Sequence, residues 1–226
     1  SCVENESHKL PSRTGKSRKP KFRRRAEARP DEVLDAALEL FTKRGFTRTT
    51  VDQVAKRAGL SKGAVYLYFP SKKALLAGLV RRAVVPVADT ALGVIADYRG
   101  DPRPVIRQLV GMMAGKMTDP KVFAVPKLVI REAVGAPEIA QMYREEVLDR
   151  AMPALAGLIA QGVEGGYIRK VDPELTIRSI LGPLMMHLVM AEVFSIKPDD
   201  GLALDRLVEN HLTILFAGLE PEGATT

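Results

Sequence analysis

Residues 49–76 read TTVDQVAKRAGLSKGAVYLYFPSKKALL, and this stretch decides the fold. Thr50 and Gln53 have the spacing of a capping box, which predicts the start of a short helix. Gly59 can adopt the positive φ that ends it, and Ser61 can cap a second, very short helix. Two such helices joined by the AGLS turn have the spacing of a helix-turn-helix. An ordinary helical hairpin in an all-α core would give the same pattern.

Charge in the chain favours the first of these interpretations. The net charge is +7 over 226 residues, and it is unevenly distributed. Residues 47–82 contain eight Lys and Arg side chains against one acid, Asp52. Residues 1–29 contain ten against three, whereas residues 83–226 carry an acidic excess. Such a concentration of positive charge is typical of a surface that binds a polyanion such as nucleic acid.

The second short helix, residues 62–69, has one face suited to a core and others suited to contact. Val65 and Phe69 share a face, which we expect to pack on the preceding helices. The other faces carry Lys62, Gly63, Ala64, Leu67 and Tyr68, with Tyr66 at the border. The small residues would let the helix approach base edges closely. Lys62 can donate to guanine, Leu67 can contact a thymine methyl, and tyrosine hydroxyls can reach phosphates.

These residues closely resemble the DNA-binding domain of TetR-type (AcrR-like) bacterial transcriptional regulators over about residues 28–80. The capping Thr, the A-G-L-S turn, Y-x-Y-F and S-K-x-x-L all fall in register. The resemblance implies a three-helix head with its third helix in the major groove. Asp52 departs from it, because some members have a basic, base-reading residue there. The expected DNA contacts are Thr49, Thr50, Ser61, Lys62, Gly63, Ala64, Tyr66, Leu67, Tyr68 and Lys72, with Arg24 and Arg25 from the preceding arm.

The whole chain is predicted to be all-α, with nine helices in a TetR-like arrangement. We expect a disordered basic arm over residues 1–28, a helix-turn-helix domain over 29–76 and a ligand-binding and dimerisation domain over 77–226. Segments 127–147 and 162–182 resemble the C-terminal domain of one AcrR-like subgroup, which implies ligand binding and dimerisation. The nine expected helices cover about 30–44, 51–58, 62–69, 72–98 (kinked at Pro86), 103–117, 121–134, 138–164, 173–195 and 202–217.

Enzymatic and metal chemistry find no support in the sequence. The three histidines are isolated, and no two share a helix face at i, i+4. The single cysteine, Cys2, excludes an internal disulfide and a cysteine-based zinc cluster. GMMAGKM at 111–117 lacks the spacing and the Ser or Thr of a phosphate loop. We therefore expect no catalytic residues, no metal and no cofactor.

An apolar ligand site in the C-terminal part is suggested by its methionines. All eight lie beyond residue 110, and flexible thioethers suit an adaptable cavity. Plain core packing would account for many of them equally well. Arg131 and His187 are polar groups in apolar surroundings that could orient a ligand, although a surface ion pair and a core histidine are the alternatives. The expected ligand contacts are Met113, Met117, Arg131, Tyr143 and His187.

A dimer interface is expected on the last two helices. From Ser179 to Ala191 there is no formally charged residue, and apolar side chains cover this helix nearly all round. The chain's own core can cover one side, and a second copy is the expected cover for the other. TetR-type regulators build a four-helix bundle from the same pair of helices. The expected interface residues are Leu181, Met185, Leu188, Leu204, Val208, His211, Leu212 and Leu215.

Together these patterns predict a cytoplasmic, homodimeric transcriptional regulator, most simply a repressor, that a small apolar effector releases from a palindromic double-stranded DNA operator. The alternative is a helical protein-interaction or small-molecule-binding module whose basic head is incidental. No membrane segment is expected, because the longest nearly apolar run, 180–194, is too short and is interrupted.

Overall fold

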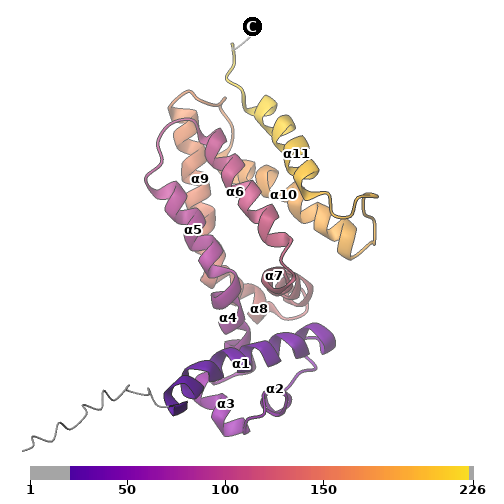
Figure 1. Ribbon diagram of the computed structural model, residues 1–226. Coiled ribbons are helices and arrows are strands. Elements are labelled where there is room, and N and C mark those ends of the chain that lie inside the picture. The colour runs from indigo at the N-terminus through magenta and orange to yellow at the C-terminus, as the bar shows by residue number, and fades with distance from the viewer. Residues whose placement is uncertain (1–20, 224–226) are drawn as a thin grey trace, which may run out of the picture.

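The computed structural model describes residues 21–223, with side chains from Pro30 onward, and every regular element in this range is helical (Figure 1). The predicted all-α class is thereby confirmed. The elements are α1 (Lys21–Arg44), α2 (Val51–Arg57), α3 (Lys62–Tyr68), α4 (Lys72–Ala83), α5 (Val85–Ala96), α6 (Pro102–Met117), α7 (Pro120–Ala133), α8 (Pro137–Tyr143), the π-helical turn η1 (Arg144–Leu148), α9 (Asp149–Glu164), α10 (Pro173–Glu192) and α11 (Leu204–Leu219).

Local capping fixes the helix-turn-helix as the sequence predicts. The Gln53 amide donates to the Thr50 hydroxyl at 3.2 Å, and the Thr50 amide donates to the Gln53 side chain at 3.1 Å. The Ser61 hydroxyl accepts from the Ala64 amide at 3.2 Å and so caps α3. Gly59 has a φ of +69°, which a residue with a side chain would rarely adopt. The caps at Thr50 and Ser61 and the turn at Gly59 therefore fix where α2 begins and ends and where α3 begins.

Helix α1 is longer than predicted. It begins at Lys21, so Pro30, which was expected near its first turn, lies inside it. The segment before Pro30 is rich in Arg, Ala and Glu, all good helix formers, and this propensity competes with the loss of one backbone donor at the proline. Residues 1–20 of the predicted arm lie outside the described residues.

Two of the nine predicted helices are interrupted. The segment 72–98 breaks at Val84 into α4 and α5, because Pro86 can occupy only the first turn of a new helix without losing a hydrogen bond. The segment 138–164 contains η1 between α8 and α9. A single π turn inside a helix shifts the facing of the residues after it, and such turns are frequent at functional sites.

Two apolar cores organise the chain. The first joins the head to the middle of the chain: Val54 and Val65 of α2 and α3 belong to the same buried cluster as Leu128 of α7 and Ile139 of α8. The second lies among α6, α9, α10 and α11 and includes Leu212. In Figure 1 the head of α1, α2 and α3 lies at one end, and α4 leads from it into the rest of the molecule. The expected boundary at 76/77 falls inside α4, which packs on both α1 and α7.

Candidate functional site

Helix α3 presents an exposed and partly apolar face. Val65 is completely buried and Phe69 packs against the same core, which confirms the predicted inward face. Leu67 is 84% exposed, Tyr66 is 42% exposed and Tyr68 is 39% exposed. Three consecutive large side chains exposed on one short helix exceed the scattered apolar residues of an ordinary surface. Nothing in the chain's own core requires them there.

The residues around this exposed face leave room for a close partner. Lys62 is exposed, and its ammonium lies 6.0 Å from the Tyr66 ring centroid. A methyl group added at Gly63 would meet nothing within 4 Å, and Ala64 beside it is partly exposed. Ser61 uses its oxygen to cap α3, but its O–H remains able to donate. The outward face of α3, defined here as Lys62, Gly63, Ala64, Tyr66 and Leu67, is therefore open.

Thr49 and Thr50, although adjacent, point to different environments. Thr50 is exposed at the start of α2, and its hydroxyl keeps a free donor. Thr49 is only 1% exposed, and its hydroxyl donates to the Gly45 carbonyl at 2.8 Å. Its oxygen also lies 3.3 Å from the Leu40 carbonyl. Because the hydroxyl is committed inside the protein, we withdraw the Thr49 side chain from the expected phosphate contacts.

Lys72 also has an internal role that the sequence did not reveal. Its ammonium donates to the carbonyls of Phe46 at 2.8 Å and Thr47 at 3.1 Å. It lies 4.5 Å from the centroid of the Phe46 ring. An ammonium has three N–H donors, so one is left for an external acceptor. Lys72 therefore ties the start of α4 to the loop between α1 and α2, and any phosphate contact is additional to this role.

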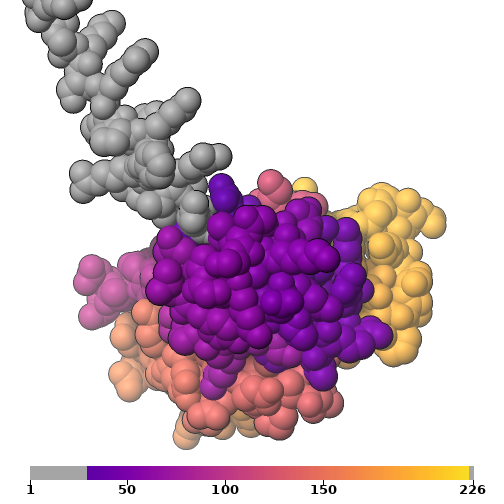
Figure 2. Space-filling model, turned by 90° about the horizontal axis from the view of Figure 1, so that it is seen from below, coloured from indigo at the N-terminus to yellow at the C-terminus, as the bar shows by residue number. Residues whose placement is uncertain are grey.

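Several cations of the head have no acidic partner among the described residues: Arg48, Lys56, Lys62 and Lys73. In contrast, Arg57 pairs with Glu39 at 2.6 Å. Figure 2 looks onto the head end-on, where the N-terminal helices cover the centre of the face. Arg24 and Arg25 belong to the first turns of α1, but their side chains lie outside the described residues. This end of the molecule therefore carries positive charge that no acidic side chain of the described residues neutralises, which favours binding of an anionic partner.

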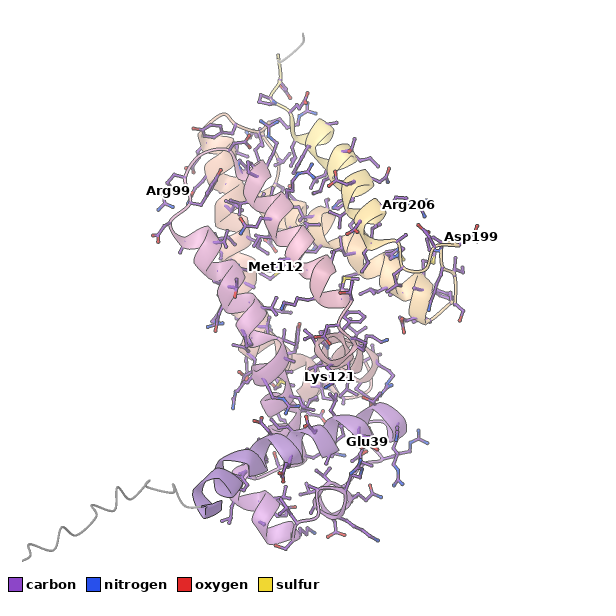
Figure 3. All side chains as sticks on the ribbon, viewed as in Figure 1. Glu39, Arg99, Met112, Lys121, Asp199 and Arg206 are labelled. Atoms are coloured by element: carbon purple, nitrogen blue, oxygen red, sulfur yellow. The ribbon has the colours of Figure 1, made fainter. Side chains whose placement is uncertain are left out.

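A second feature is an apolar cavity of about 190 Å³ in the helical C-terminal part. Its walls come from α5, α6, the η1–α9 segment and the middle of α10. Figure 3 labels Met112, one of the lining residues, on α6. The lining includes Val87, Ala88, Ala91, Leu92, Ile95, Leu109, Met112, Met113, Tyr143, Val147, Leu148, Ala151, Met152, Leu155 and Leu181. We refer to this space as the apolar cavity.

Of the five expected ligand contacts, only Met113 and Tyr143 line the apolar cavity. Met117 is buried at the far end of α6, beside Phe123 and Leu204. The His187 ring nitrogen lies 2.6 Å from the Leu202 carbonyl and so fastens α10 to the following loop. Met117 and His187 were therefore wrong as contacts to this cavity, because a short-range apolar pattern does not say which gap a helix faces.

Arg131 was likewise expected at the ligand and lies elsewhere. It is exposed on α7 and donates to the Phe41 carbonyl near the end of α1 at 2.9 Å. It also pairs with Glu132 at 3.0 Å. Positive charge suits the carbonyl end of a helix. Arg131 therefore joins the head to α7.

Helix α5 contributes several residues to the cavity wall, and the sequence did not predict any of them as ligand contacts. Its residues are apolar on several faces, yet none of them is fully buried. A helix that is apolar on several faces is expected to be buried by its neighbours. Helix α5 is only partly buried because several of its residues line the cavity. The continuous apolar run around Pro86, which by itself predicts only a kinked helix, is the signal that could have indicated this wall.

Tyr143 is the one lining residue in the described range with a polar side-chain group. No hydrogen bond joins its hydroxyl to another described residue, and the oxygen is not sealed off by protein. Burial raises the pKa of the Tyr143 hydroxyl above its ordinary value. The residues that line the cavity thus carry one hydroxyl, that of Tyr143, and otherwise hydrocarbon and thioether side chains.

Polar contacts connect the cavity walls to the head. Val147 and Leu148 of η1 face the cavity, while Glu146 in the same turn accepts from the Arg81 guanidinium of α4 at 3.0 Å. Helix α4 starts at Lys72 and so reaches the loop before α2. Helix α4 therefore contacts η1 near its C-terminal end, through Arg81, and the head at its N-terminal end, through Lys72. A displacement of η1 would shift α4 and, with it, the head.

Exposed apolar side chains concentrate on α10, the segment after it and α11. Half of the 14 large exposed apolar residues lie there: Leu175, Met186, Met190, Val193, Phe194, Ile196 and Ile214. Gly182 lies on the same face of α10, and a methyl group added to it would meet nothing within 4 Å. We call this surface the α10–α11 face; it is the part of these two helices that the rest of the chain does not cover.

The expected dimer residues lie mostly on the opposite side of these helices. Leu188, Leu204, Val208, His211 and Leu212 are buried in the chain's own core, and Leu181 lines the cavity. His211 contacts the Ile180 carbonyl at 2.9 Å. Met185 and Leu215 are partly buried and pack against the same core. The buried five were wrong as interface residues, because a helix that is apolar all round does not show which side faces its own chain.

No group of three or more His, Cys, Asp or Glu side chains in the described range is arranged to hold a metal ion. None of the helices there combines the length and the apolar character that a membrane span requires.

An exposed, capped α3 on a basic three-helix head, joined to a helical part with an apolar cavity, defines a helix-turn-helix protein of two-part design. Residues 33–79 match the family model described as "Bacterial regulatory proteins, tetR family". Residues 95–209 match "Tetracyclin repressor-like, C-terminal domain". The chain belongs to the TetR family of bacterial regulators.

Relatives in sequence and structure agree with this assignment. The HTH-type transcriptional regulator RutR of Escherichia coli K12 is 26% identical over 208 residues, covering 88% of this chain and 93% of RutR. Matches to two other curated regulators span 55% and 42% of those proteins. The fatty acid degradation regulator FadR of Bacillus halodurans has a TM-score of 0.68 and 26% identity, with 86% of this chain and 97% of FadR covered.

A third relative shares the fold at lower identity. SmeT, the repressor of the Stenotrophomonas maltophilia efflux pump SmeDEF, has a TM-score of 0.68 and 22% identity, covering 87% of this chain and 93% of SmeT.

Proposed function

We propose that the chain acts in the cytoplasm as a homodimeric repressor that binds a palindromic DNA operator and releases it when a small, largely apolar molecule fills the cavity. The outward face of α3 is the observation that carries the proposal. Leu67 stands exposed among Lys62 and the two tyrosines, and the small Gly63 and Ala64 let this face approach base edges. Thr50, Tyr66 and Tyr68 would hold phosphates beside it, joined by the third donor of Lys72.

The second copy would cover the α10–α11 face. Its exposed Met186, Met190 and Ile214 are apolar, and Gly182 permits close approach of a second helix. A two-fold pair of heads would place two α3 helices in successive major grooves, with half-site centres about 34–36 Å apart or slightly more. A palindromic operator has the same two-fold symmetry.

Release would follow from the links between the cavity and α4. An effector pressing on Val147 and Leu148 would move η1, and the Glu146–Arg81 pair would carry this to α4 and the head. It can do so only in proportion to its different affinities for the DNA-bound and free conformations. Two fold relatives were solved with small molecules, SmeT with triclosan and Bacillus subtilis FadR with stearoyl-CoA, which supports a ligand role for this part of the fold.

Selection of bound duplexes from a random library at physiological salt tests the proposal. We expect one enriched sequence with two-fold symmetry, bound by two chains. Lys62→Ala and Leu67→Ala should each change the enriched sequence at one position per half-site. An incidental basic head would instead enrich no sequence, and its binding to any duplex would disappear as salt is raised.

A further inference from the structure

The chemistry of the cavity wall restricts what can occupy it. Around the cavity the described side chains are aliphatic, aromatic or thioether groups, apart from the hydroxyl of Tyr143. Charged residues adjacent in sequence to lining residues are already paired: Arg150 of α9 pairs with Asp89 of α5 at 2.5 Å, and Glu146 pairs with Arg81. No lining residue in the described range offers a charge to a ligand.

An ionised ligand would therefore lose its hydration without receiving a partner. Burying an unpaired carboxylate or ammonium is strongly unfavourable, and the usual result is exclusion or neutralisation. The wall thus selects against free acids, amines and phosphorylated molecules. A neutral molecule meets no such penalty.

The cavity volume and its flexible residues restrict size. A cavity of about 150 Å³ lined by apolar groups holds benzene, and this one measures about 190 Å³. A single ring with a short substituent fits that space. Met112, Met113 and Met152 in the wall can change rotamer and admit somewhat larger molecules, because methionine is unbranched and flexible.

The Tyr143 hydroxyl supplies the one directional contact. Tyr143 lines the cavity, and its hydroxyl has no hydrogen-bond partner among the described residues; because the oxygen is not sealed off by protein, the hydroxyl can pair with a ligand. We propose that the effector is an uncharged, apolar molecule of about single-ring size whose one polar group pairs with the Tyr143 hydroxyl. This rests on the proposed function, in which the cavity is the effector site.

Three probes of similar shape test the proposal with the full-length protein: ethylbenzene, acetophenone and benzoate. Direct binding is followed by ligand-detected NMR and by the shift in melting temperature, without DNA. We expect acetophenone to bind most tightly and benzoate at least about 100-fold more weakly. Tyr143→Phe should weaken acetophenone by about two- to tenfold, the range of one neutral hydrogen bond, and leave ethylbenzene unchanged.

A cavity-filling control locates the site. Ala91→Phe on α5, and separately Ala151→Phe on α9, should abolish binding of both neutral probes while circular dichroism confirms the fold. Benzoate binding as tightly as acetophenone, or an equal response of both neutral probes to Tyr143→Phe, would overturn the assignment.

DNA measurements separate this inference from the proposed function. If acetophenone binds with the expected ranking but leaves operator affinity unchanged, the effector role fails and the ligand class stands. If the operator is bound and released by a charged molecule, the repressor function stands and the ligand class fails.

Discussion

Lys72→Met separates the internal role of Lys72 from its expected phosphate contact. The substitution keeps the aliphatic stem and removes the two hydrogen bonds to the Phe46 and Thr47 carbonyls and the charge over the Phe46 ring. Hydrogen bonds from charged groups contribute about 1.5–3 kcal/mol each when well buried. Because this ammonium is partly exposed and water can replace it at both carbonyls, we expect stability to fall by about 2 kcal/mol in total.

Urea unfolding at fixed protein concentration measures this change. For a chain of this size about 2 kcal/mol corresponds to a fall in Tm of roughly 4–8 °C. Lys73→Met is the matched control, because Lys73 is the neighbouring exposed lysine without an acidic partner among the described residues. It removes the same charge and should change stability by less than about 0.5 kcal/mol. Equal stability of the two variants would refute the internal role.

The same pair of variants tests the phosphate contact. Lys72→Met should weaken binding to every duplex similarly and lower the slope of log affinity against log salt by about 0.9 for each phosphate that the protein no longer neutralises. If the salt slope is unchanged while stability falls, Lys72 acts only inside the protein.

Four further predictions concern α3, η1, the α10–α11 face and the N-terminal arm. Lys62→Ala should relax preference at one operator position at a cost of about 1–3 kcal/mol, measured by competition among single-base variants; a uniform reduction over all duplexes would place α3 wrongly. Glu146→Gln should reduce the factor by which acetophenone lowers operator affinity while acetophenone and operator each bind alone as before, and an unchanged factor would exclude η1 as the link. Gly182→Leu should abolish the dimer in sedimentation at micromolar concentration, whereas Gly111→Leu on α6, also open in the chain, should preserve it. Deletion of residues 1–22 should reduce operator affinity less than neutralising Arg23, Arg24 and Arg25 together, and unchanged specific affinity after removal of 1–28 would contradict any role for the arm.

Sequence predicted what local chemistry determines. The caps of α2 and α3 and the turn at Gly59 depend on residues a few positions apart, so their spacing was sufficient. The inward face of α3 followed from helical periodicity alone, since Val65 and Phe69 are four residues apart. The all-helical class followed in the same way.

Sequence did not predict what depends on distant partners. Thr49 and Thr50 are adjacent threonines that the sequence cannot distinguish. In the fold the Thr49 hydroxyl is buried against the Gly45 and Leu40 carbonyls, whereas Thr50 is exposed. The carbonyls that hold Lys72 lie 25 and 26 residues away from it, and no local pattern indicates them.

The apolar helices show the same limit on a larger scale. In α10 both sides are apolar, so periodicity could not distinguish the core side from the α10–α11 face. The cavity arises where α5, α6, the η1–α9 segment and α10 fail to fill the space between them, and such a gap is a property of packed helices that lie far apart in the sequence. Methionine content indicated its region, and Met113 lines the cavity, but Met117 one turn later lines a different gap.

The measurement that tests DNA reading by α3 most directly is the ratio of affinities for the selected operator and for a scrambled duplex of equal length at about 0.15 M salt. We expect a ratio of at least about 10³, with two chains on each operator. We also expect Leu67→Ala to lower this ratio without weakening binding to the scrambled duplex. A ratio near one, or one that Leu67→Ala and Lys62→Ala leave unchanged, would contradict the claim that the outward face of α3 reads DNA.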